Sequence, residues 1–217
     1  MSAVLHFDGR PAAGHTMHIA ILTFDGFNEL DSLIALGVLN RIRRPDWRVS
    51  LCCPEPEVTS MNGVTVHAQS LLEEACQADA VIVGSGLRTR EVVADQRLMA
   101  RLALDPSRQL IAAQCSGTLV LAKLGLLGQV PACTDLTTKP WVQEADVQVL
   151  NQPFHARGNL ATAGGCLASA YIAGWLLARL EGLEAASSAL HYVAPVGEKE
   201  AYVDQAMRNI KPYLEGL

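Results

Sequence analysis

The segment Gln109-Leu-Ile-Ala-Ala-Gln-Cys-Ser-Gly-Thr-Leu-Val-Leu-Ala-Lys-Leu-Gly125 predicts a strand, a sharp turn and a helix, with Cys115 at the turn. Residues 110–113 are a short apolar run typical of a buried strand, and apolar residues recur at helical intervals after Gly117. A nucleophile on a strand-to-helix turn projects from the end of a sheet, and a nearby glycine leaves room for the tight backbone. The segment therefore predicts a nucleophile elbow that carries a reactive thiol.

The sequence is compatible with two interpretations of Cys115, a reactive thiolate and an unreactive buried thiol. The amides at the start of a helix favour an anion, so we expect them to lower the pKa of Cys115 and hold it as a thiolate. The alternative is a small buried hydrophobic residue, which describes most free cysteines. The segment alone leaves both interpretations open.

Length and composition restrict the class of protein. The chain has 217 residues, which suits one α/β domain with a core large enough to fold alone. A formal net charge of -5, with no basic run, argues against binding to nucleic acid or to an anionic membrane. No apolar run reaches the ~18 residues that a membrane helix needs. We therefore expect a small-molecule or protein partner, no nucleic acid and no membrane.

The cysteines and the first residues suggest a compartment. The six cysteines include no CxxC pair, which predicts reduced thiols and neither disulfides nor a metal site. The beginning of the chain lacks the basic segment and continuous apolar core of a secretory signal. We therefore expect a cytoplasmic protein.

The order of the predicted elements gives the fold class. Residues 1–16 show no period and are expected to be an N-terminal extension, whereas residues 17–217 are expected to form a single domain. Strands alternating with helices predict parallel βαβ units in a three-layer α/β/α sandwich with a mostly parallel, flavodoxin-like sheet. The expected strands are 18–24, 47–53, 58–61, 64–68, 80–83, 110–113, 147–150, 154–157 and 159–162. The expected helices are 28–42, 71–77, 89–104, 117–127, 168–183, 184–193 and 198–210.

Functional sites in such folds lie outside the carboxyl ends of the strands. This rule places residues 25–31, 84–87 and 115–117 along one rim of the sheet. Five separate motifs stand out in the chain: Asp25-Gly-Phe-Asn-Glu-Leu-Asp31, Gly84-Ser-Gly86, Cys115-Ser-Gly-Thr118, Ala122-Lys-Leu-Gly-Leu-Leu-Gly128 and Gly158-Asn-Leu-Ala-Thr-Ala-Gly-Gly165.

With these motifs the chain resembles the ThiJ/PfpI superfamily, relatives of the class I glutamine amidotransferase domain, over about residues 17–193. Within it, the pattern resembles most closely the isonitrile hydratase branch, whose elbow reads Cys-Thr-Gly and whose first helix carries an aspartate. The matching residues here are Cys115-Ser116-Gly117 and Asp31.

The resemblance implies a set of roles. Cys115 would be the nucleophile and Asp31 the proton donor, while the amides around Ser85, Gly86 and Ser116 would stabilise negative charge beside the Gly117 turn. The implied reaction is hydration of an isonitrile to an N-substituted formamide, without a cofactor or metal. The resemblance also implies a homodimer and a small-molecule substrate.

Asp31 also has a purely structural interpretation, because acids are common in the first turn of a helix. With the resemblance, Asp31 is the better candidate for a catalytic role, and Glu29 is its solvated neighbour. Glu29 and Gly84, together with Asp135, Trp141 and Cys166, are the candidate residues for the pocket. Core packing explains Trp141 and Cys166 equally well.

The chain departs from the superfamily pattern in its histidines. Many members have a histidine after the elbow helix, at the place where this chain has Asp135, and PfpI-type proteases have another at the position of Ser116. A histidine-dependent peptidase or amidase is therefore disfavoured. His155 and His191 are the remaining candidates, and both are more typical of surface or satisfied histidines.

Three alternatives stand beside the hydratase. One is a non-enzymatic redox sensor or ligand-binding protein in which Cys115 is oxidised to a sulfinate. Another is the ligand-sensing domain of a regulator, which the absence of a basic recognition helix disfavours. A deglycase or glyoxalase is the third, weakened by the missing histidine.

Overall fold

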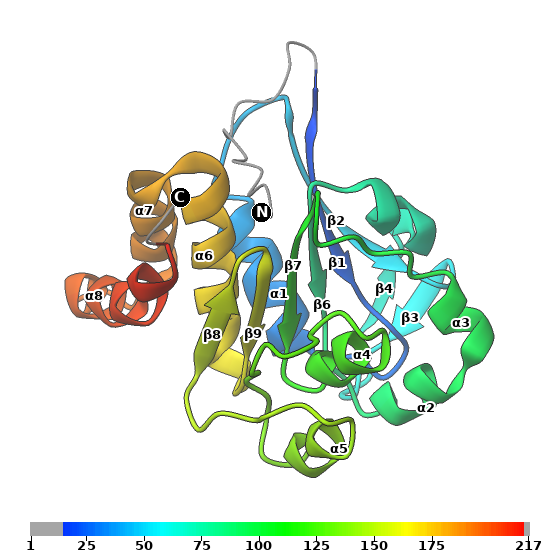
Figure 1. Ribbon diagram of the computed structural model, residues 1–217. Coiled ribbons are helices and arrows are strands. Elements are labelled where there is room, and N and C mark those ends of the chain that lie inside the picture. The colour runs from blue at the N-terminus through cyan, green and yellow to red at the C-terminus, as the bar shows by residue number, and fades with distance from the viewer. Residues whose placement is uncertain (1–14, 215–217) are drawn as a thin grey trace.

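The seven strands of the central sheet lie in the order β5-β2-β1-β6-β7-β9-β8 in the computed structural model, which describes residues 15–214 (Figure 1). Every neighbouring pair is parallel except β8 and β9. The strands are β1 (Met17–Leu22), β2 (Trp47–Cys53), β5 (Ser70–Leu71), β6 (Ala80–Val83), β7 (Leu110–Gln114), β8 (Phe154–Arg157) and β9 (Leu160–Ala163).

Helices cover both faces of this sheet, as Figure 1 shows. One layer comprises α1 (Glu29–Leu39), α6 (Ser169–Glu181), α7 (Leu183–Val193) and α8 (Lys199–Ile210). The other comprises α2 (Thr89–Ala94), α3 (Gln96–Ala100), α4 (Gly117–Lys123) and α5 (Lys139–Gln143). Short 3-10 turns lie at η1 (Leu72–Gln77), η2 (Cys166–Ala168) and η3 (Lys211–Tyr213). The predicted three-layer, mostly parallel fold is confirmed.

Apolar side chains form one core on each face of the sheet. Along β1, Ile19 and Ile21 belong to the cluster under α1 and α6, whereas Ala20 and Leu22 belong to the cluster under α4. Successive side chains of a strand point to opposite faces, so an almost continuous apolar strand is buried on both. This two-sided burial fixes β6 and β7 in the middle of the sheet, with their carboxyl ends side by side.

The predicted helix over residues 89–104 is divided into two. Asp95 has an extended ψ of 96°, and its carboxylate accepts hydrogen bonds from the amides of Arg97 and Leu98 at 2.9 and 3.0 Å. Asp95 therefore caps α3 and ends α2. The spacing of apolar residues predicts one helix here, but it carries no information about a capping residue within the segment. The elbow helix α4 also ends at Lys123, earlier than predicted, and Gly125 follows it with a φ of +72°.

Two predicted strand regions also differ. The hairpin forms from β3 (Glu57–Thr59) and β4 (Thr65–His67), and residues 60–64 connect them in place of the predicted two-residue turn. The expected strand 147–150 contributes only one bridge, from Val149 to Ala132.

Most of the predicted N-terminal extension lies outside the described residues, which begin at His15. Within the described part of the chain, no helix is both long and apolar enough to cross a bilayer.

Candidate active site

The turn between β7 and α4 holds Cys115 in a left-handed conformation with a φ of 46°. This conformation is rare for residues other than glycine and persists where the surroundings enforce it. The Cys115 amide donates to the carbonyl of Ala163 at 2.8 Å, and the Cys115 carbonyl accepts from the Thr134 hydroxyl at 2.7 Å. Both sides of the cysteine backbone are thus anchored, which gives the predicted elbow.

Gly117 allows this elbow to lie directly against β6. A Cβ atom at Gly117 would lie 2.3 Å from the carbonyl oxygen of Val83 and 2.8 Å from that of Gly84, and neither backbone atom can move freely. We therefore expect Gly117→Ala to lower the free energy of unfolding by about 3 kcal/mol, at the upper end of overpacking effects. Urea unfolding followed by circular dichroism measures this change.

Gly37→Ala is the matched control, because nothing lies within 4 Å of the Cβ position of this glycine in the last turn of α1. It should unfold at the wild-type urea concentration or above it, since alanine favours a helix. Equal unfolding midpoints for Gly117→Ala and the wild type would contradict the close approach.

Asp31 lies in the first turn of α1, beneath the elbow. Asn28 caps this helix by accepting from the Leu30 amide at 3.1 Å. The Asp31 side chain is completely buried and accepts a hydrogen bond from the Ser85 hydroxyl through Oδ2. Its Oδ1 has no hydrogen-bond partner among the described residues. Burial raises the pKa of Asp31, and the Ser85 hydrogen bond opposes this only in part.

Cys115, Cys166 and Asp31 form a compact cluster in which the two Sγ atoms and a carboxylate oxygen all lie within 4.8 Å of one another. Cys115 is only 4% exposed, and burial together with the negative charge of Asp31 raises its pKa. The prediction of a lowered pKa is therefore wrong, because burial and the carboxylate outweigh the amides of α4. Ionisation of either the Asp31 carboxyl or the Cys115 thiol therefore disfavours ionisation of the other.

The glycine loop after β6 meets the elbow through hydroxyl groups. The Gly86 amide donates to Ser116 Oγ at 3.1 Å, and Ser116 Oγ lies 2.7 Å from the Thr89 hydroxyl. The Gly86 amide, expected to stabilise negative charge, is thus already occupied in this structure. The Ser116 amide at the start of the elbow helix has no acceptor among the described residues, which leaves it available to a developing charge.

A cavity of ≈ 290 Å³ opens above Cys115. Its walls include seven of the predicted site residues: Ser85, Gly86, Cys115, Ser116, Asp135, Trp141 and Cys166. They also include Asn28 and Leu87, which belong to the segments placed on the rim, and three residues that were not predicted: Met61, Thr137 and Thr138. The structure therefore brings most of the predicted site together around one small chamber.

Two predicted pocket residues do not line this cavity. Glu29 binds the β3–β4 loop instead, accepting from the Ser60 hydroxyl and from the side chain of Asn62 at 2.9 Å. Gly84 allows the backbone after β6 to pack closely against the end of β1, since a Cβ atom there would lie 2.8 Å from the carbonyl oxygen of Leu22. The Asp135 carboxylate does face the cavity, but it also accepts from the amides of Thr137 and Thr138, both at 2.9 Å.

Asn28 and Gln114 are polar side chains whose contacts with the thiols of the site were not predicted from the sequence. Asn28 donates from Nδ2 to Cys166 Sγ at 3.2 Å. Gln114 is fully buried, and its Nε2 donates to the Gly165 carbonyl at 2.8 Å and to Cys115 Sγ at 3.5 Å. A glutamine at the end of an otherwise apolar strand was the available signal for Gln114, because a buried amide requires partners.

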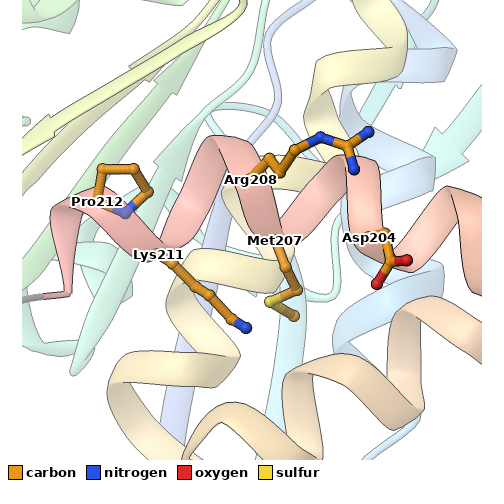
Figure 2. Close-up of a pocket in the computed structure, with 5 residues that line it drawn as sticks. All are labelled: Asp204, Met207, Arg208, Lys211 and Pro212. Atoms are coloured by element: carbon orange, nitrogen blue, oxygen red, sulfur yellow. The ribbon is translucent and has the colours of Figure 1, made fainter.

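Neither candidate histidine reaches the cavity. His155 lies 3.4 Å from the Tyr213 hydroxyl, and His191 lies 3.5 Å from the Glu200 carboxylate on α8. A further hollow of ≈ 390 Å³ lies along α8 and the turn after it, where Figure 2 shows the lining side chains of Asp204, Met207, Arg208, Lys211 and Pro212. This lining contains no cysteine and no histidine, so the chamber above Cys115 is the better candidate.

The raised pKa of Asp31 predicts a pH-dependent cost to stability. Above its unfolded pKa of about 4, the folded state holds a proton that the unfolded state releases, so stability falls as the pH rises toward the folded pKa. Asp31→Asn removes this effect while keeping an acceptor for Ser85. We expect the melting temperature of the variant to exceed that of the wild type by more at pH 7 than at pH 4. Parallel melting profiles would contradict the raised pKa.

Comparison with known proteins places this geometry in context. The model of the DJ-1/PfpI family matches residues 17–178. Among solved structures, a ThiJ/PfpI family protein from Pseudomonas syringae superposes with a TM-score of 0.73 at 18% identity, covering 95% of this chain and 96% of that chain. DJ-1beta from Drosophila melanogaster gives a TM-score of 0.70 at 21% identity, covering 82% and 97%. A DJ-1 superfamily protein from Salmonella typhimurium gives 0.69 at 25% identity, covering 82% and 99%. No curated protein matches the chain.

Proposed function

Because the chain belongs to the DJ-1/PfpI family, we propose that it is a cysteine-dependent hydratase that converts a small isonitrile into an N-substituted formamide without a cofactor. The observation that carries this proposal is the contact between a buried acid and a nucleophile. An Asp31 carboxylate oxygen and Cys115 Sγ lie within 4.8 Å of each other beneath a small chamber. This pair can attack a carbon atom and then deliver a proton to it.

The proposed reaction proceeds in two stages. The Cys115 sulfur attacks the terminal carbon of the isonitrile and forms a C–S bond while Asp31 delivers its proton to that same carbon, which gives a thioimidate. The proton of the thiol passes to the Asp31 carboxylate in the same stage, so the acid is protonated again. Water then adds to the carbon and the C–S bond breaks, so the formamide leaves and the thiol is restored. The net change is addition of one water molecule, with no oxidation or reduction.

The surroundings of Cys115 favour this chemistry over acyl transfer. Within the described part of the chain, no histidine lines the cavity, so a thiol–imidazole pair of the peptidase type is missing. Proton delivery to carbon requires instead an acid that is still protonated near neutral pH, and burial moves the pKa of Asp31 in that direction. A volume of ≈ 290 Å³ suits a small organic molecule and not a peptide.

The test is product formation from cyclohexyl isocyanide, followed by mass spectrometry of N-cyclohexylformamide. We expect its rate of formation to be proportional to the concentration of the purified protein and to be abolished by prior alkylation of Cys115. Absence of the formamide from a folded protein whose Cys115 still reacts with a thiol reagent would overturn the proposal. Selective peroxide oxidation of Cys115 in such a protein would then favour the sensor alternative.

A further inference from the structure

We propose that Asp31, Cys115 and Cys166 form a binding site for a thiophilic divalent metal ion such as Zn²⁺, and that binding there inhibits the enzyme. These residues come from the first turn of α1, from the elbow and from η2, so only the fold brings them together. Their ligand atoms, one oxygen and two sulfurs, all lie within 4.8 Å of one another. The proposal departs from the expectation, drawn from cysteine spacing, that the chain has no metal site.

The spacing suits one tetrahedral ion. With Zn–S bonds of about 2.3 Å, two thiolates on the same ion lie about 3.8 Å apart, and a thiolate and a carboxylate oxygen lie slightly closer. A cluster already confined to 4.8 Å needs only small side-chain adjustments to reach that geometry. Two sulfur ligands favour Zn²⁺ over Mg²⁺ or Ca²⁺, which prefer oxygen alone.

The groups around the cluster support metal ligation. The Asp31 carboxylate is completely buried. Its Oδ2 accepts a hydrogen bond from the Ser85 hydroxyl, whereas its Oδ1 has no hydrogen-bond partner among the described residues. A buried acceptor without a partner is costly, and a metal ion would satisfy it. Each sulfur also accepts an amide N–H, from Asn28 to Cys166 and from Gln114 to Cys115. Such outer hydrogen bonds orient ligands and stabilise thiolates at metal sites.

The cavity provides the remaining coordination position. Cys115 and Cys166 both line its wall, so an ion bound to them faces the chamber with one position open to water. The metal replaces the protons of the two thiols and of the Asp31 carboxyl, and these protons leave to solvent. The inhibitory part of this inference depends on the proposed hydratase, because the ion occupies the sulfur that would attack the substrate. Metal binding itself does not depend on it.

The experiment is a calorimetric titration of the reduced full-length protein with Zn²⁺, checked by competition with a chromophoric chelator. We expect one ion per chain and at least about 100-fold weaker binding in Cys166→Ser, which loses a ligand. Asn28→Ser keeps a good helix cap but loses the N–H···S bond, so we expect about tenfold weaker binding. Cys76→Ser is the control for a thiol outside the cluster and should bind like the wild type.

Substitution with Co²⁺ gives a second readout, because two thiolate ligands produce an intense sulfur-to-metal charge-transfer band that Cys166→Ser should weaken. Equal Zn²⁺ affinity in the wild type and Cys166→Ser, or no binding by the reduced wild type, would overturn the site. Both measurements are made without substrate, so their result is independent of whether the formamide is formed. If it is formed, one equivalent of Zn²⁺ should stop the reaction and EDTA should restore it; continued turnover with the ion bound would overturn the inhibition.

Discussion

Cys115→Ala is expected to lower kcat/KM for isonitrile hydration by at least about 1,000-fold, because without the sulfur no covalent intermediate forms. The variant should fold, since alanine at a φ of 46° bears the same backbone strain as cysteine and Cys115 makes its anchoring contacts through backbone groups. Steady-state rates of formamide production measure the loss, and circular dichroism verifies the fold.

Cys76→Ala provides the matched control. Cys76 is a free thiol on η1 that contacts the carbonyl of Arg101 and does not line the cavity. Its loss should leave the rate of hydration close to that of the wild type. A Cys115→Ala protein that retained a tenth of wild-type activity would refute the role of this thiol as nucleophile.

Asp31→Asn is expected to lower kcat/KM by about 100- to 10,000-fold, the range for loss of a general acid. Asparagine matches the shape of aspartate and still accepts from the Ser85 hydroxyl, but it has no acidic proton to deliver. Rates measured across the pH range distinguish loss of the acidic proton from a change in the shape of the site, because loss of the proton should also remove the pH dependence that Asp31 imposes. Lower activity should accompany the higher stability expected above, as is common where a site is built at a cost to stability.

Glu29→Gln tests whether the effect is specific to Asp31. Glu29 lies in the same turn of α1, yet its side chain points to the β3–β4 loop and contacts Ser60 and Asn62. We expect activity of the same order as the wild type. An equal loss in both variants would indicate damage to the helix start and not removal of a proton donor.

The features predicted correctly from the sequence are those set by residues close together in the chain. The elbow was predictable because an apolar strand, a cysteine and Gly117 are adjacent in the chain, and the sheet was predictable from alternating apolar runs. The division of α2 from α3 was missed because capping by Asp95 competes with helix continuation within the same periodic pattern.

The rest of the site depends on contacts between distant segments. Glu29 was wrongly expected to line the pocket, because the sequence does not show that its side chain binds Asn62, which is distant in the chain. The pKa of Cys115 was predicted in the wrong direction because the helix amides are visible in the sequence, whereas burial and the approach of Asp31 are not. Gln114 joins the site through the carbonyl of Gly165, a contact that requires the completed fold.

The order of strands also determines how the sheet ends. Its outermost strands, β5 and β8, have two and four residues, so each presents few unpaired backbone groups to another molecule. At the β8 edge, the Tyr213 ring packs edge-on against Phe154 with ring centroids 5.6 Å apart. Long exposed strand edges recruit further strands and lead to aggregation, whereas these short edges give little template for it. Half of the residues in this chain are hydrophobic, and the short edge strands limit the pairing of its sheet with the sheets of neighbouring molecules.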